Sequence, residues 1–146
     1  MEVSMEMKGQ STLLFALLIS IFGLMIIGLI LDGSLVLRYY IILRNACSLS
    51  AQTAAGQAVD VPYYMRYSEV ILDPSLARTI AYESFNMNRI SSMKLVGVRV
   101  SPEGRWVEVE GEGEVVPVML KWVIPSIKVR VKARAYGAYG IRQEGE

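Results

Sequence analysis

The feature that most constrains the fold of this chain is an apolar run over residues 11–31, which contains no charged residue. A helix needs about 20 residues to cross the hydrocarbon core of a bilayer. Charged residues stand on both sides of the run, and Tyr39 and Tyr40 follow it where aromatic side chains often mark a membrane surface. The sequence therefore predicts one membrane-spanning helix over residues 11–31, with Asp32, Tyr39 and Tyr40 at the membrane interface.

A cleaved secretory signal and a buried core helix are the two alternatives to a span. A secretory signal has an apolar stretch of about 7–15 residues and a small-x-small cleavage site. This run is longer, and Asp32-Gly33-Ser34 follows it without such a site. A chain of 146 residues is also too small to bury a helix of this apolarity. The flanking charges leave the orientation open, because Lys8 precedes the run while Arg38 follows it.

The region after the span is expected to continue the helix and then to form a separate domain. Apolar and small residues recur at steps of three and four in residues 32–61. Pro62 should end this helix, since proline disfavours the α conformation in the residue before it. The sequence thus divides into a leader-like segment 1–10, the span, the helical extension 32–61 outside the membrane, and an α+β domain over residues 62–146.

Small residues dominate the end of the helical extension. Ala, Ser, Gly, Thr and Gln make up most of residues 45–58, which allows another backbone to approach closely. Ordinary helical alanine is the alternative interpretation, but the pattern favours packing within the protein or with copies of it. Cys47, the single cysteine, is interpreted as a small residue at a helix contact. The candidate contact residues are Ala46, Ser50, Ala51 and Ala54, together with Met119, Leu120 and Trp122 further along the chain.

The domain is expected to contain one more helix and a sheet. Asp73-Pro74 predicts an N-cap and the first position of an amphipathic helix over residues 74–87. Beyond Ser92 the apolar period changes to two, and the turn sequence 101–104 predicts a β-hairpin. The predicted fold class is α+β, with a three-stranded antiparallel sheet packed on the long helix and the second helix.

Two strands of this sheet carry opposite charges on one face. Val107, Val109, Gly111, Gly113 and Val115 alternate with acids in one strand, and the last strand alternates aliphatic residues with bases. If the strands are antiparallel neighbours, their charges form a cross-strand ladder. A basic stripe that binds acidic lipid or nucleic acid is the alternative, but the matching acidic stripe favours the ladder. The charged residues are Glu108, Glu110, Glu112, Glu114, Lys128, Arg130, Lys132 and Arg134.

The segment 117–125, which connects these strands, is too apolar for a routine loop. It covers the end of the core, reaches toward the bilayer or meets a partner, and the sequence leaves these alternatives open.

Catalysis is not predicted. The chain has no histidine and one cysteine, so neither an intrachain disulfide nor a histidine base or ligand can form. No GxxxxGK[ST], GxSxG or CxxC motif occurs. The net charge of +1 gives no field that would draw nucleic acid. We therefore expect no cofactor, no metal, no nucleic-acid partner and no enzymatic activity.

The N-terminal residues resemble the TadE/TadG-like pilus-assembly proteins. The resemblance rests on Lys8-Gly9-Gln10-Ser11, on the apolar run with Phe15, on Gly28 to Gly33, and on Leu43-Arg44-Asn45-Ala46 before the alanine-rich helix. It covers about the first 58 residues closely and the C-terminal half in pattern only. It implies a minor pilin or pseudopilin of the tight-adherence (Flp) secretion system, single-pass in the cytoplasmic membrane, with the N-terminus in the cytoplasm and the domain outside.

The resemblance also implies partners and a processing site. The partners would be other pilins and pilus-assembly platform proteins, in a homo- or hetero-oligomer. Gly9 and Gln10 would form the leader cleavage junction, but Leu14 stands where processed members carry a glutamate, which predicts slow or absent cleavage. Ser48 stands where the family usually has an aspartate. A main filament subunit and a membrane-tethered extracytoplasmic binding module are the competing functions.

Overall fold

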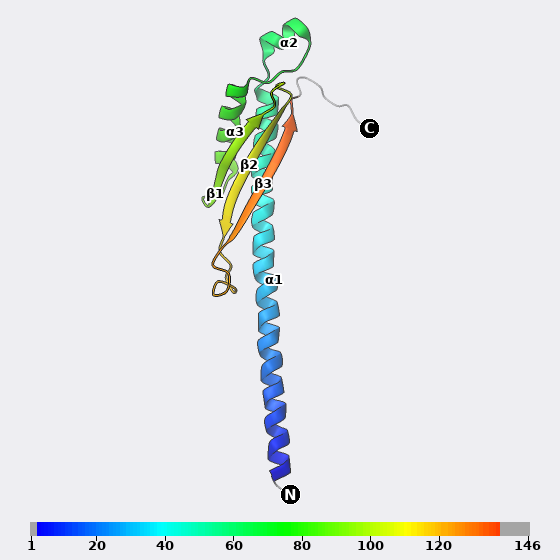
Figure 1. Ribbon diagram of the computed structural model, residues 1–146, viewed down its shortest axis with the longest axis vertical. Coiled ribbons are helices and arrows are strands. Elements are labelled where there is room, and N and C mark those ends of the chain that lie inside the picture. Colours follow the sequence, from blue (N-terminus) through cyan, green and yellow to red (C-terminus); the bar gives the residue numbers. More distant parts are fainter. Residues whose placement is uncertain (1–2, 138–146) are drawn as a thin grey trace, which may run out of the picture.

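A computed structural model describes residues 3–137, with side chains from residue 11 onward. The domain gathers around the C-terminal half of one long helix, and the N-terminal half of that helix projects away from it (Figure 1). The elements in chain order are α1 (Val3–Gln57), α2 (Val61–Tyr67), α3 (Pro74–Asn88), β1 (Met93–Val100), β2 (Trp106–Val115) and β3 (Ile127–Tyr136).

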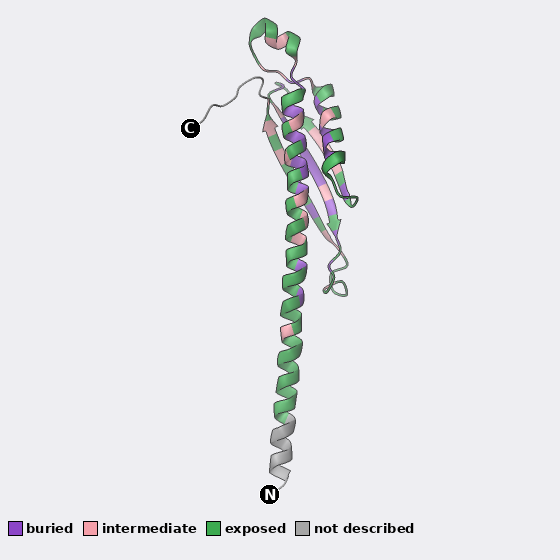
Figure 2. Ribbon diagram, turned by 180° about the vertical axis from the view of Figure 1, so that it is seen from behind, coloured by how far each residue is buried: buried purple, intermediate pink, exposed green. Residues whose placement is uncertain are grey.

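The domain has two layers. The sheet has the strand order β1-β2-β3, with antiparallel pairing throughout. Helices α1 and α3 cover one face of it: β2 and β3 pack on α1, and β1 packs on α3. Buried residues follow the side of α1 and of the sheet where the two layers meet (Figure 2). The predicted α+β class and the three-stranded antiparallel sheet are therefore confirmed.

Helix α1 ends earlier than the sequence predicts. It stops at Gln57, and Pro62 lies in the first turn of α2, a helix that the sequence analysis did not predict. Two backbone bonds explain the stop: the Asp60 N–H donates to the Ile71 carbonyl at 2.8 Å, and the Asp73 N–H donates to the Ala58 carbonyl at 2.8 Å. This short antiparallel contact draws the chain away from the helical path.

Asp60 and Asp73 begin the next two helices. The Asp60 carboxylate accepts a bond from the Tyr63 N–H at 3.0 Å. The Asp73 carboxylate accepts bonds from the Ser75 and Leu76 N–H groups at 2.8 and 3.2 Å. Both are N-caps, which satisfy donors that a helix leaves unpaired at its start. The N-cap predicted at Asp73 is confirmed, and α3 ends one residue beyond the predicted range.

Two glycines of β2 let the sheet approach α1 closely. A Cβ atom added at Gly111 would lie 2.7 Å from the Cys47 Sγ, and one at Gly113 would overlap the Tyr39 ring. A side chain at either position would therefore push α1 away from the sheet. The valines that alternate with these glycines are buried on the same face, as the period of two predicts: Val107, Val109 and Val115.

The charged ladder is confirmed in register. Each acid of β2 lies opposite a base of β3, in the pairs Glu108 with Arg134, Glu110 with Lys132, Glu112 with Arg130 and Glu114 with Lys128. The alternation of acids with valine and glycine predicts a solvated acidic face, but Glu110 is 6% exposed. Arg130 Nε and Lys132 Nζ lie 2.5 and 3.5 Å from its Oε1, and their long side chains cover it.

Candidate functional site

Asp32 holds the 117–125 loop against α1. Its carboxylate accepts bonds from three consecutive backbone N–H groups: Oδ1 from Val118 at 2.7 Å, both oxygens from Met119 at 3.2 and 3.1 Å, and Oδ2 from Leu120 at 2.7 Å. Bonds from neutral donors to an ionised acceptor are stronger than neutral pairs. We call this arrangement the Asp32 clasp. It ties the loop to the helix directly beyond the apolar run.

The clasp favours the ionised carboxylate. The Asp32 side chain is buried, with 3% of the residue exposed. Burial raises the pKa of this carboxyl, but bonds from the backbone of Leu120, Val118 and Met119 lower it, and together they leave the pKa below its usual value. The backbone N–H groups of the loop therefore stabilise the negative charge of this buried carboxylate.

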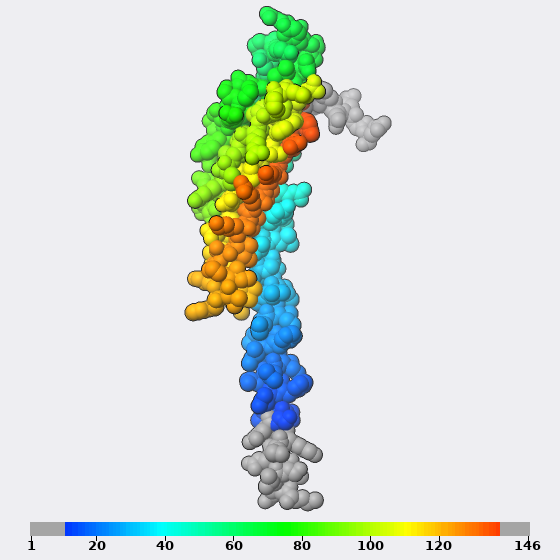
Figure 3. Space-filling model, in the orientation of Figure 1, coloured from blue at the N-terminus to red at the C-terminus, as the bar shows by residue number. Residues whose placement is uncertain are grey.

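The loop lies beside the apolar part of α1. A Cβ atom added at Gly28 would lie 3.1 Å from the Met119 Cβ, so the glycine makes room for the loop. Below this contact is an open apolar hollow of about 250 Å³, which Met119 and Leu120 share with Ile21, Leu24, Met25 and Gly28. In Figure 3 the loop, drawn in orange, rests against the blue section of α1.

The tip of the loop presents apolar side chains outward. Trp122 is 97% exposed, Val123 is 77% exposed and Val118 is 68% exposed, whereas Pro117 is fully buried. The loop thus closes the end of the core with Pro117 and turns a bulky surface away from it. This one segment therefore covers the core and also presents a surface for an outward contact, two of the roles that the sequence left open.

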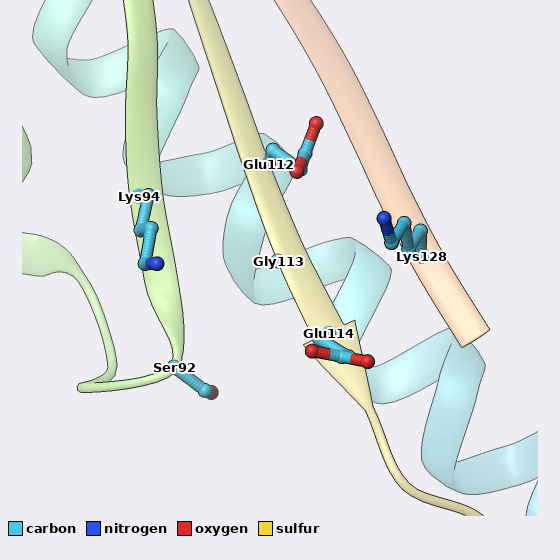
Figure 4. Close-up of a pocket in the computed structure, with 6 residues that line it drawn as sticks. All are labelled: Ser92, Lys94, Glu112, Gly113, Glu114 and Lys128. Carbon is cyan, nitrogen blue, oxygen red and sulfur yellow. The ribbon is translucent and has the colours of Figure 1, made fainter. Parts of the chain in front are cut away.

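A shallow depression of about 230 Å³ lies at the same end of the sheet. In Figure 4, Glu112 and Glu114 of β2 stand between Lys94 of β1 and Lys128 of β3. Two acids and two bases balance each other, so the depression offers no net charge to an ion. Within residues 11–137, no group of three or more His, Cys, Asp or Glu residues is placed to hold a metal.

The small residues of α1 lie inside the domain. Ala46 is 2% exposed, and Ser50, Ala51 and Ala54 are fully buried. The three alanines belong to the core that α1 shares with α3 and the sheet. Their small size lets these elements approach, and in this arrangement none of them is open to a second molecule.

Cys47 and Tyr39 also serve the core. Burial, and to a lesser extent the charge of Glu110, raises the pKa of the Cys47 thiol to about 11, so the thiol stays protonated. Tyr39, which the sequence predicts at the membrane interface, contacts the domain: its hydroxyl lies 2.9 Å from the Ser92 Oγ, and its ring packs against the core. Tyr40 is 39% exposed. Gly9 and Gln10 lie in α1, and the structure describes only their backbone.

The clasp is the feature that sequence reasoning missed. The sequence predicts Asp32 only as a residue of the membrane interface, and the structure shows that its oxygens also contact backbone groups 86 to 88 residues further along the chain. Backbone N–H groups have no signature in a sequence. The only available signal was the coincidence of one acid at the end of the span with one apolar loop.

No family model matches the sequence, and neither a curated protein nor a solved structure gives a match. The geometry establishes a coarser point. Helix α1 from Ser11 onward is long and apolar enough to cross a membrane, and only 6% of its most apolar stretch of 18 residues is buried.

Proposed function

We propose that this chain is a membrane-anchored minor pilin or pseudopilin that takes part in assembling a pilus of the tight-adherence type. The observation that carries the proposal is the continuity of α1. Its N-terminal part is apolar and exposed, and its C-terminal part is the spine of the domain core. One rigid helix thus joins a lipid-embedded segment to a folded head, as a pilin-type subunit requires.

The same continuity favours an anchor over the two alternatives. A secretory signal has a short apolar region that ends at a cleavage site, but α1 runs without a break from the apolar run into the core. A core helix would be covered by its own chain, but large apolar side chains such as Leu17 and Phe22 are 61% and 66% exposed. The orientation, with the domain outside the cytoplasm, comes from the sequence resemblance.

Assembly would use the face of α1 that the domain leaves free. Beyond the span, Leu37, Ile41 and Leu49 are 59%, 48% and 46% exposed, although they lie next to the domain core along the chain. Exposed aliphatic residues on a helix are suited to packing against another helix. This surface replaces the small-residue stretch, which is buried, as the proposed site of contact with other pilins.

Deletion and complementation test the proposal. In cells that carry the gene, deletion should abolish or strongly reduce pili, and the wild-type gene should restore them. Ile41→Asp should fail to restore them, because burying an unpaired carboxylate in a packed interface costs roughly 3 kcal/mol or more. Met87→Asp is the matched control, since Met87 is 79% exposed on α3, away from α1's free face.

Both variants should reach the membrane in wild-type amounts and resist protease as wild type does. Unchanged pili after deletion would refute the pilus assignment. Full restoration by Ile41→Asp would keep the assignment and reject the proposed packing face.

A further inference from the structure

We propose that the 117–125 loop is a second membrane contact, inserted in the interface of the leaflet from which α1 leaves the bilayer. Its ligand is the phospholipid surface itself. The inference rests on the membrane crossing in the proposed function, and it is independent of whether the protein assembles a pilus.

The depth of the loop follows from its contacts with α1. Gly28, which packs against Met119, lies three residues inside the end of the apolar run. At a rise of 1.5 Å per residue this is about 5 Å below that end. The hollow that Met119 and Leu120 share with α1 extends further inward, to Leu24 and Ile21. Interfacial segments lie about 5–10 Å into the boundary between headgroups and acyl chains, which is the depth found for this loop.

The side chains of the loop suit that depth. Trp122 and Val123 point away from the core and are 97% and 77% exposed. Tryptophan is enriched at membrane interfaces, because its ring is apolar and its N–H can still reach polar groups. Lys121 is also exposed. Its ammonium group can extend toward the headgroups while its methylene stem lies along the apolar surface.

The backbone of the loop is prepared for a place with little water. Three of its N–H groups donate to Asp32. The Val123 and Ile124 N–H groups both donate to the Leu120 carbonyl, at 2.9 and 2.8 Å. A buried N–H without a partner costs free energy, so these internal bonds lower the penalty of moving the segment out of water. Asp32 is thus a positioning residue that sets the loop at the depth of Gly28.

The loop is continuous with the lipid-facing surface of the span, which favours lipid over a protein partner as its occupant. Exposed apolar residues of α1, such as Met25 and Leu29 at 64% and 62%, lie at the same level. A single-span anchor places everything at that level in contact with the bilayer surface. A water-filled gap between the loop and the bilayer would leave the apolar side chains of Trp122 and Val123 exposed to water beside lipid.

Depth-dependent quenching of Trp122 tests the inference. The full chain is reconstituted in phosphatidylcholine vesicles, with Trp106→Phe so that Trp122 is the single tryptophan. Lipids brominated near the glycerol end of the acyl chain should quench its emission roughly twofold, because an interfacial indole touches those carbons. Its emission should lie to the blue of free tryptophan, and aqueous acrylamide should quench it weakly. Both leaflets have the same composition, so random insertion does not affect the result.

The matched control is Trp122→Phe, which leaves Trp106. Trp106 begins β2 and lies ten residues of strand away from the loop, about 30 Å. Brominated lipid should leave its emission unchanged. Asp32→Ala, added to the Trp106→Phe chain, should release the loop and remove most of the lipid quenching of Trp122, whereas circular dichroism of the domain stays at the wild-type value.

The outcomes separate the inference from the proposed function. Strong acrylamide quenching of Trp122 without lipid quenching, in protein that resists alkaline extraction, overturns the loop contact and leaves the anchor intact; a loop reserved for a protein partner gives this result. Extraction of the protein by alkali overturns the membrane crossing and the loop contact together. Unchanged lipid quenching in the Asp32→Ala chain overturns the positioning role of Asp32.

Discussion

Replacing Gly111 by alanine tests how closely α1 and β2 approach. The added Cβ would lie 2.7 Å from the Cys47 Sγ, 3.0 Å from the Leu43 Cδ1 and 3.1 Å from the Phe85 Cε2. All three neighbours are fully buried, so none can move into solvent. The helix or the strand must therefore shift to admit one methyl group.

The expected loss of stability comes from two opposing effects. Overpacking a closed core costs about 1–3 kcal/mol. Replacing glycine by alanine in a strand regains roughly 0.5–1 kcal/mol, because alanine loses less backbone freedom on folding. We expect Gly111→Ala to lower the free energy of unfolding by about 1–2 kcal/mol.

Gly97→Ala is the matched control, since a Cβ at this β1 position would meet nothing within 4 Å. It should be neutral or slightly stabilising. Cys47→Ala supplies the second test, because it removes the closest obstructing atom. The double variant with Gly111→Ala should be more stable than the sum of the two losses implies, with a coupling of about 0.5–2 kcal/mol.

Guanidinium titration of the full chain in non-ionic detergent, followed by tryptophan fluorescence, measures these differences. Equal stability of the Gly111→Ala and Gly97→Ala proteins would refute the close approach. Strict additivity of Gly111→Ala and Cys47→Ala would show that the Sγ is not the limiting contact.

Two further predictions concern charge. Glu110→Lys should destabilise the domain by about 1–3 kcal/mol, because it sets a nearly buried base against Arg130 and Lys132. In that background Arg130→Glu should restore more stability than Lys128→Glu, since the register partner of Lys128 is Glu114. Equal rescue by the two variants would contradict the pairing. Hydrogen bonds from the Ser75 side chain and backbone and from the Leu76 backbone lower the pKa of Asp73. Its ionised form therefore adds stability above the unfolded-state pKa, and this contribution is lost as the pH falls through the lower folded-state pKa. The stability advantage of wild type over Asp73→Asn, which keeps a capping oxygen, should therefore shrink on acidification, and a constant difference between pH 7 and pH 3 would contradict it.

The elements that could be predicted from the sequence are those encoded by local pattern. The span, α3 with its Asp73 cap, and the hairpin each have a period or a turn signal of their own. The charged ladder was also predictable, because complementary charges at a period of two fit only neighbouring strands in one register. The burial of Glu110 could not be predicted, because it depends on the reach of Arg130 and Lys132, which alternation does not encode.

The features that sequence reasoning missed arise from contacts between distant segments. The end of α1 at Gln57 depends on backbone pairing of residues 58–60 with residues 71–73, and neither stretch reads as a strand. Similarly, the alternation placed Gly111 and Gly113 on the inner face, but it did not show that they admit Cys47 and Tyr39. Positions of this kind are set by tertiary packing, which overrides local propensity.

The packing of α1 against β3 constrains the order in which the domain can fold. The Cys47 thiol lies 3.9 Å from the carbonyl of Val131, which follows it by 84 residues, and the core is closed by this last strand. If the domain crosses the membrane as proposed, the buried face of α1 emerges first and β3 emerges last. The helix must then wait, with its alanine face open to water, until almost the whole chain has been exported. A chain truncated before β3 would keep that face exposed to water permanently. Its anchored helix, without the covering strand, would then be exposed to quality-control proteases.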